Sequence, residues 1–120
     1  MDKGKDKDKN ELQSAYAVIF TAQRTHDDTQ EAYAIAAKRM EELAQTMPGY
    51  LGLVSTRDEN GFGITISYWE SEDAIKAWRD HLEHSAVRER GRDEWYLNYK
   101  LQVAKIERSY AWNKLENNNE

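Results

Sequence analysis

The stretch from residue 48 to residue 78 constrains the fold more than any other part of the sequence. Residues 51–56 show a period-two pattern rich in strand formers, and residues 63–69 are strand-like again. Asn60 and Gly61 stand between the two runs, and both tolerate the positive φ that a tight hairpin turn needs. The stretch therefore predicts two antiparallel strands joined by a short turn.

A helix is predicted to begin directly after this hairpin. Ser71 is a good N-cap, and Glu72 and Asp73 place negative charge on the first helical turn, where the helix dipole favours it. Apolar residues then recur at helical spacing, at Ala74, Ile75, Trp78 and Leu82. The pattern weakens afterwards, which predicts a polar and bent continuation that ends at Gly91.

The segment before the hairpin predicts a strand and a helix. Residues 15–24 read as a strand with apolar side chains on both faces, so we expect it to be covered on both sides. A helix layer supplies one cover, and a partner subunit is the simplest source of the second. The helix opens with Asp28 and Glu31 at capping-box spacing and stops at Pro48-Gly49. Its expected apolar stripe consists of Tyr33, Ala36, Ala37, Met40, Leu43, Ala44 and Met47.

A last strand is predicted from Trp95 to Tyr110, where apolar and polar residues alternate. The element order is then β-α-β-β-α-β, the ferredoxin-like arrangement of an α+β protein, with two helices on one face of an antiparallel sheet. Residues 14–112 form this one domain. We expect residues 1–13, rich in alternating Lys and Asp, to be a disordered leader, and residues 113–120 to be a polar tail.

The charge balance and the lack of cysteine exclude several classes of protein. The chain of 120 residues carries 22 acidic and 17 basic residues, so we expect neither nucleic acid nor an anionic membrane surface as a partner. Without cysteine it has no disulfide, thiolate metal site or cysteine nucleophile. No apolar run approaches the roughly 20 residues of a membrane span. No signal peptide is visible, so we expect a cytoplasmic protein.

Three short motifs carry a family resemblance: PGYLG at residues 48–52, YWESE at residues 68–72 and AIKAW at residues 74–78. Over about residues 15–112 the chain resembles the antibiotic biosynthesis monooxygenase (ABM) superfamily of dimeric α+β barrels. The resemblance implies a homodimer whose two sheets pack into a barrel, with a pocket between sheet and helices in each subunit. It also implies oxidation of a phenolic or quinol-like aromatic without metal or flavin, or heme degradation, although other members have no established reaction.

Heme degradation is the weaker expectation. The resemblance to that branch would require an Asn on the first strand, a Trp on the second helix and a His further along this helix. Trp78 fits, but residues 15–24 contain no Asn, and His81 and His84 come too early.

The candidate site residues are two histidines and four aromatic residues. His81 and His84 lie three apart, so on one helix they share a face. Either is a candidate base for a phenolic substrate, and a structural role at a helix bend is the other interpretation. No third metal ligand lies near them in the sequence, so we expect no metal site. The expected substrate-binding residues, bordering a pocket between the sheet and the second helix, are Tyr16, Phe20, Tyr68 and Trp78.

Other aromatic and basic residues leave alternatives open. Trp69, Trp95 and Tyr96 either line a pocket or belong to the core or a dimer interface. The arginines at the ends of predicted elements are expected to form surface ion pairs rather than an anion clamp; they are Arg24, Arg57 and Arg92.

Two functions of different classes follow. The first is a cofactor-independent monooxygenase of the ABM type that acts on a small aromatic or quinol-like substrate. The second is a non-catalytic dimeric domain that binds a small hydrophobic ligand. Both need the same apolar cavity with few polar groups, so the sequence does not decide between them.

Overall fold

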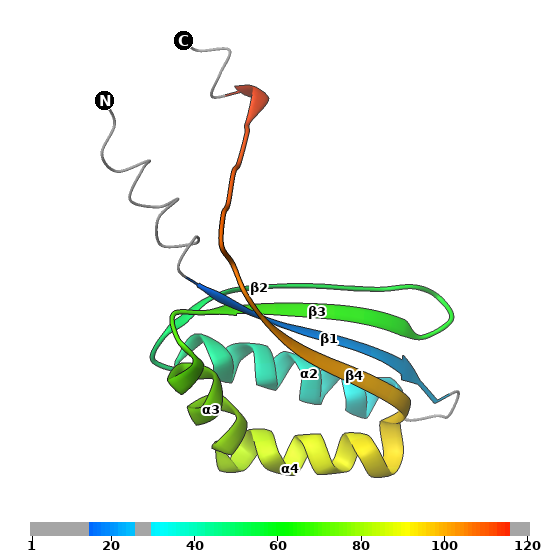
Figure 1. The fold of residues 1–120 in the computed structure, drawn as a ribbon. Helices are drawn as coiled ribbons and strands as arrows, with labels where there is room; N and C mark the ends of the chain where they lie inside the picture. Colours follow the sequence, from blue (N-terminus) through cyan, green and yellow to red (C-terminus); the bar gives the residue numbers. More distant parts are fainter. Residues whose placement is uncertain (1–14, 26–29, 116–120) are drawn as a thin grey trace, which may run out of the picture.

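The structure is a computed structural model that describes residues 15–25 and 30–115. These residues form an antiparallel sheet with helices on one of its faces (Figure 1). The strands are β1 (Tyr16–Arg24), β2 (Tyr50–Arg57), β3 (Phe62–Trp69) and β4 (Tyr96–Lys105). The helices are α2 (Gln30–Gln45), α3 (Glu72–Asp80) and α4 (Leu82–Arg90), followed by the π-helical turn η1 (Gly91–Trp95).

The order of strands in the sheet is β2-β3-β1-β4, so β1 lies between β3 and β4 and is antiparallel to both. Together with the element order, this confirms the predicted α+β fold of the ferredoxin-like type. The leader expected at residues 1–13 lies outside the described residues, as do Asp28 of the expected capping box and residues 116–120 of the expected tail. In the part of the chain that the structure describes, no helix is long and apolar enough to cross a membrane.

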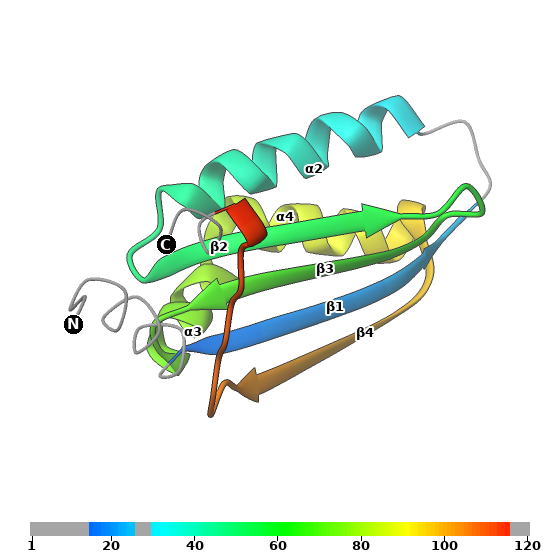
Figure 2. The same cartoon turned by 90° about the horizontal axis from the view of Figure 1, so that it is seen from above.

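The register of the strands decides which side chains face the helices. Tyr16 pairs with Trp69, and paired residues of antiparallel strands share a face. The Trp69 ring stacks on Trp78 of α3, so this is the face that the helices cover. The opposite face carries Ile19 and, directly across from it, Ile66. Seen from above, α2 and α4 lie toward the β2 side of the sheet, and β4 forms the opposite edge (Figure 2).

The hairpin between β2 and β3 forms where it was predicted, but Asn60 does not adopt the positive φ that the sequence allowed it. Gly61 adopts a φ of 89°, in the left-handed region that favours glycine. The Oδ1 atom of Asp58 accepts hydrogen bonds from the backbone N–H groups of Asn60 and Phe62, each at 2.9 Å. This side chain therefore holds the tight turn closed in addition to the positive-φ glycine.

The second helix begins as predicted and is broken at His81. Ser71 Oγ accepts the N–H of Ala74 at 3.1 Å, which caps α3. His81 leaves the helical conformation with a ψ of 131°, and its Nδ1 accepts the N–H of Glu83 at 3.2 Å, which caps α4. His81 and His84 therefore do not lie on one face of a continuous helix, as their spacing had suggested.

Three further details differ from the expectation. Ala37 is exposed, whereas the rest of the expected stripe on α2 is at least partly buried. The helical conformation does not end at Gly91 but continues through η1, and a Cβ on Gly91 would lie 2.7 Å from Tyr96 Cε2, so glycine permits a close approach there. β4 ends at Lys105 because its ladder with β1 ends there; the Ile106 N–H still donates to Ala15.

Gly49 connects α2 to β2 and packs against Ala74 at the start of α3. Its φ is 84°, and an added Cβ would lie 2.6 Å from Ala74 Cβ, a distance at which something must shift. Its carbonyl oxygen accepts the N–H of Glu70 at 2.8 Å. Glycine is thus required here both by the backbone conformation and by the contact between two elements.

We expect Gly49→Ala to lower the free energy of unfolding by about 2 kcal/mol or more, because it adds a left-handed penalty to a steric overlap. Gly52→Ala is the matched control, since nothing lies within 4 Å of an added Cβ at that position. That control should change the free energy of unfolding by about 0.5 kcal/mol at most. Urea denaturation of both variants makes the comparison, and equal stabilities would contradict it.

Candidate functional site

A stack of three rings lies at one end of the helix-covered face. Trp69, at the end of β3, is 0% exposed, and its Nε1 donates to Ser67 Oγ at 2.9 Å. Trp78 of α3 stacks on it with ring centroids 5.9 Å apart. His84 of α4 stacks on Trp78 in turn. The two ring centroids are 4.1 Å apart, and the ring planes are 15° apart. The stack joins the sheet to both α3 and α4.

A hydrogen bond to the backbone of Trp78 decides the tautomer of His84. Its Nδ1 lies 2.9 Å from the carbonyl oxygen of Trp78, and a carbonyl only accepts, so Nδ1 carries the proton. In the neutral ring, Nε2 then holds the lone pair. Burial lowers the pKa of His84, and the charges of Arg88 and His81 lower it further, while the bond to Trp78 opposes them. His84 is therefore a neutral imidazole at neutral pH.

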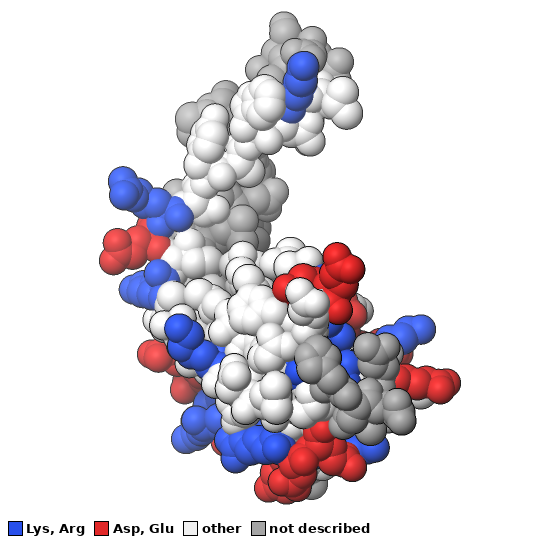
Figure 3. Space-filling view, turned by 90° about the vertical axis from the view of Figure 1, so that its right-hand side faces the viewer, with Lys and Arg blue, Asp and Glu red and all other residues white. Residues whose placement is uncertain are grey.

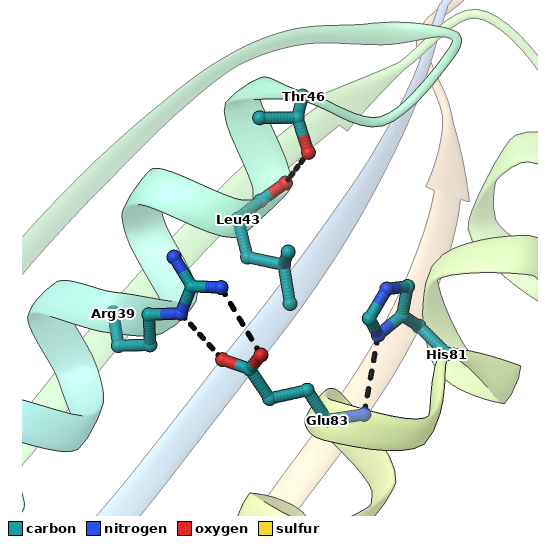
Figure 4. Close-up of polar contacts among 5 residues, drawn as sticks. All are labelled: Arg39, Leu43, Thr46, His81 and Glu83. Carbon is teal, nitrogen blue, oxygen red and sulfur yellow. Dashed lines mark hydrogen bonds and ion pairs between the residues drawn. The ribbon is translucent and has the colours of Figure 1, made fainter.

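His81 is committed to the backbone. Its Nδ1 lone pair accepts the Glu83 N–H that caps α4, so this nitrogen is not available as a base (Figure 4). The side chain of Glu83 turns toward α2, where Arg39 donates to it from Nε at 2.6 Å and from Nη2 at 3.1 Å (Figure 4). The hydrogen bond from Arg39 lowers the pKa of the Glu83 carboxyl. This exposed ion pair ties α4 to α2.

A second aromatic cluster lies at the other end of β1. Phe20 of β1 contacts Tyr96 and Tyr99 of β4, with ring centroids 5.5 Å and 5.4 Å away. Tyr33, in the first turns of α2, packs edge-on against Tyr96 and against Trp95, which is almost fully buried. These rings therefore join α2 to β1 and β4 at the end of the sheet opposite the stack.

A small hollow lies beside this cluster and has room for about one water molecule. Its lining comes from β1, β2, β3, α2 and the start of β4, with Phe20, Ala22, Arg24, Tyr33, Ser55, Thr56, Arg57, Gly61, Gly63, Thr65 and Tyr96. No Asp or Glu is among these residues. Figure 3 views this end of the molecule, where charged side chains surround a largely uncharged surface.

Arg24 is the one buried charged residue in the described part of the chain, with 5% of its surface exposed. Its guanidinium carbon lies 3.9 Å from the centroid of the Tyr33 ring, and that of Arg57 lies 4.4 Å from the same ring. Two guanidinium groups on one ring give the hollow a positive field. The expected surface ion pair is therefore wrong for Arg24, because the α2 residue Tyr33 covers it.

Two tyrosine hydroxyls meet at the edge of the hollow. Tyr96 donates its O–H to the Tyr33 hydroxyl at 3.1 Å. Burial, followed by the proximity of Tyr33, raises the pKa of Tyr96 far above its ordinary value. Tyr96 therefore stays protonated and acts as a hydrogen-bond donor at any physiological pH.

The sequence profile of the family described as antibiotic biosynthesis monooxygenase matches residues 15–90 of this chain. The chain belongs to the ABM family. The matched ABM segment runs from the start of β1 to the end of α4, so it includes the ring stack, Arg24 and Tyr33.

Individual relatives agree with this assignment. The ABM chain is 50% identical over 93 residues to the uncharacterized protein YqjZ of Bacillus subtilis (strain 168), across 78% of this chain and 80% of YqjZ. It is 24% identical over 103 residues to a Pyricularia oryzae protein named jasmonate monooxygenase ABM, across 84% of this chain but 47% of that protein.

The solved structure of SnoaB, a cofactor-independent oxygenase from Streptomyces nogalater, has a TM-score of 0.68 at 9% identity. The match covers 80% of this chain and 96% of SnoaB. At that identity the likeness shows the fold alone.

The structure divides the expected pocket of this ABM chain between two places. Trp78 and His84 are in contact in the ring stack, and Tyr16 pairs with Trp69 at the same end of the sheet. Phe20 lies at the other end, beside the hollow. Tyr68 pairs with Ala17 and faces away from the helices, because neighbours along a strand point to opposite faces. The structure thus does not bring all the expected residues together in one place.

Arg24 and Tyr33 are the residues that sequence reasoning missed as site candidates. Tyr33 was expected only in the apolar stripe of its helix. Alternation along β1 puts Arg24 on the same face as Phe20, the one available sequence signal for its burial. Among the described residues Arg92 has no acidic partner either: its Nε donates to the Tyr99 hydroxyl at 2.6 Å. Among the residues 15–25 and 30–115, no three His, Asp or Glu side chains gather as metal ligands would.

The lowered pKa of His84 predicts a specific loss of stability in acid. The unfolded chain binds a proton at His84 near its ordinary pKa of about 6.5, whereas the folded chain binds it at lower pH. The stabilisation is therefore complete above about pH 6.5 and is lost as the pH falls toward the folded pKa.

We expect His84→Asn, whose amide can still donate to the Trp78 carbonyl, to flatten the fall in stability below about pH 6.5. Urea midpoints of the original chain and the variant, measured from about pH 7.5 to pH 5, give the two slopes. A variant with an unchanged slope would show that His84 is protonated equally in both states.

Proposed function

We propose that this ABM-family protein is a cofactor-independent monooxygenase that acts on a small aromatic or quinol-like substrate, with His84 as its base. Family membership and a relative that is named a monooxygenase support the class of reaction. The observation that carries the proposal is the half-buried, neutral imidazole stacked on Trp78. A substrate ring in line with this stack would meet an aromatic wall and a nitrogen able to accept its proton.

The proposed reaction needs little from the protein beyond a dry site and a base. Nε2 of His84 takes the proton of a phenol or enol, and the resulting anion is electron-rich enough to pass an electron to O₂. One oxygen atom of O₂ enters the substrate as a carbonyl on a ring carbon that loses its single hydrogen. The other oxygen atom leaves as water, with that hydrogen and the hydrogen of the hydroxyl group. Burial around Trp69 and Trp78 would keep bulk water from the reacting anion.

The test is oxygen uptake with a panel of quinols and polycyclic phenols. We expect His84→Ala to lower turnover at least about ten-fold, because a positioned base contributes at least that much. The acid limb of the rate profile should fall below the ordinary histidine pKa of about 6.5, since His84 must be neutral to act.

His81→Asn is the matched control for this test. Asparagine is a good N-cap, so it preserves the cap of α4 while removing the second imidazole. This variant should retain full turnover. Loss of turnover in His81→Asn but not in His84→Ala would transfer the role of base to His81, as the sequence had left open.

A non-catalytic, ligand-binding domain is the second candidate, and the hollow beside Arg24 favours it. Arg24 is buried, and the described residues that line the hollow include no acid, which is a feature of binding and does not need a reaction. No oxygen uptake with any member of the panel, together with binding of a small ligand, would select this function.

We further propose that the protein is a homodimer formed through the sheet face that the helices leave open. Val54, Ile66 and Ile19 form an apolar row across three strands of that face, and Val54 is 56% exposed. An isologous packing of two such faces would bury the row twice, which is the arrangement expected from the apolar first strand.

Light scattering should give a mass near twice the 14.0 kDa of the chain. Ile66→Lys places a charge in the middle of the apolar row and should produce a monomer. Ile35→Lys is the control, because Ile35 lies on α2 with 66% of its surface exposed, and it should leave the dimer intact. A monomeric original chain at micromolar concentration would disprove the dimer.

A further inference from the structure

Buried donors without acceptors are concentrated at one place in the molecule. In the described part of the chain, three buried side-chain polar atoms lack a hydrogen-bond partner: Nε and Nη2 of Arg24, and Nε1 of Trp95. All three are donors, and both residues pack against the ring of Tyr33. A buried donor left unpaired costs about 1–3 kcal/mol, so this cluster requires an acceptor to offset it.

The two atoms of Arg24 define the shape of that acceptor. Nε and Nη2 form one edge of the guanidinium plane, and their N–H groups point the same way, as a fork that fits two oxygens. The same protein shows this fork occupied, since Arg39 holds the Glu83 carboxylate through its own Nε and Nη2 (Figure 4). A phenolate, with one oxygen, would fill half of the fork, whereas a carboxylate fills all of it.

The surroundings favour an anion over a neutral acceptor. Arg57 adds a second positive charge, and the lining residues that the structure describes include no carboxylate. The Tyr96 hydroxyl, which donates to Tyr33, stays protonated and so adds no negative charge. This concentration of positive charge occurs in a chain whose net charge is −5, so it does not follow from composition.

Aromatic side chains beside the hollow form a surface on which the apolar part of a ligand could pack. Phe20 lies between Tyr96 and Tyr99 on the helix-covered face. Leu101 pairs with Phe20 on the same face and is half exposed, at the edge of the sheet away from α2. A planar ring attached to the anion would therefore find aromatic and aliphatic contacts on one side.

We propose that this hollow binds a small aromatic carboxylic acid, with the carboxylate on the Nε–Nη2 edge of Arg24 and the ring against Phe20. Because both nitrogens are covered, the Tyr33 ring or the exposed Arg57 side chain must swing aside as the ligand enters. This inference concerns binding alone and deepens the ligand-binding alternative, so it stands or falls independently of oxygen uptake.

The direct test is a titration of the full chain with benzoate. Binding is measured by calorimetry and by the ¹⁵Nε resonance of Arg24. Benzoate should bind saturably and shift that resonance. Benzamide, which has the same shape without the charge, and acetate, which lacks the ring, should each bind at least about ten-fold more weakly. No saturable binding of benzoate, or equal binding of benzamide, would overturn the proposal.

Variants of Arg24 distinguish a binding role of this side chain from a purely structural role. Arg24→Met should weaken benzoate binding at least about ten-fold, and Arg24→Lys should weaken it too, because an ammonium lacks the fork. Arg39→Met, which removes the fork already occupied by Glu83, is the matched control and should leave binding unchanged.

Stability supplies the second measurement. Without ligand, Arg24→Met should melt at the same temperature as the original chain or higher, since it removes a buried charge with two unpaired donors and no acidic partner among the described residues. If Arg24→Met and an Asp27→Asn/Asp28→Asn double variant both lower the melting temperature strongly and equally, these carboxylates form an ion pair with Arg24. That result would overturn the proposal. If Arg24→Met fails to fold, the ¹⁵Nε shift in the original chain decides.

Discussion

The pairing of β1 with both β3 and β4 is the constraint on which the rest of the molecule depends. Side chains alternate along a strand, so a slip of one residue would exchange the two faces of β1. Phe20 and Arg24 would then leave the helix side, and Ile19 would replace them there. Hydrogen bonds to a strand on each side hold the register, and the turn at Gly61 sets the alignment of the neighbouring pair. Both candidate sites inherit their position from this one alignment.

Local signals made most of the fold predictable from the sequence. The Asn60-Gly61 turn and the Ser71 cap act within a few residues of themselves, and both form at the expected positions, with positive φ at Gly61 alone. The strand end at Lys105 was not predictable in this way. Apolar and polar residues continue to alternate beyond Lys105, but the pairing of β4 with β1 ends there. The end of this pairing depends on where the distant strand β1 begins, which local alternation does not show.

The candidate sites were less predictable because their residues meet through tertiary contacts. Whether an arginine at a strand end is buried depends on which helix residue covers it, and Tyr33 reaches Arg24 only after α2 has packed. The position of His84 on Trp78 depends on the break at His81, where a histidine side chain caps a helix. By contrast, the outward direction of Tyr68 follows from its being next to Trp69 and was available from alternation alone.

A bulge at the end of the sheet completes the hollow. Gln23 pairs with Asn98, but Arg24 pairs with Tyr96, so Leu97 is an extra residue in β4. In an unbroken ladder, Leu97 would stand opposite Arg24 and offer it no hydrogen-bonding group. The bulge turns Leu97 outward, where it is 64% exposed, and brings Tyr96 beside Arg24 on the helix side. The polar edge of the hollow, with the Tyr96–Tyr33 hydroxyl pair, thus exists because one residue of β4 is left out of the pairing.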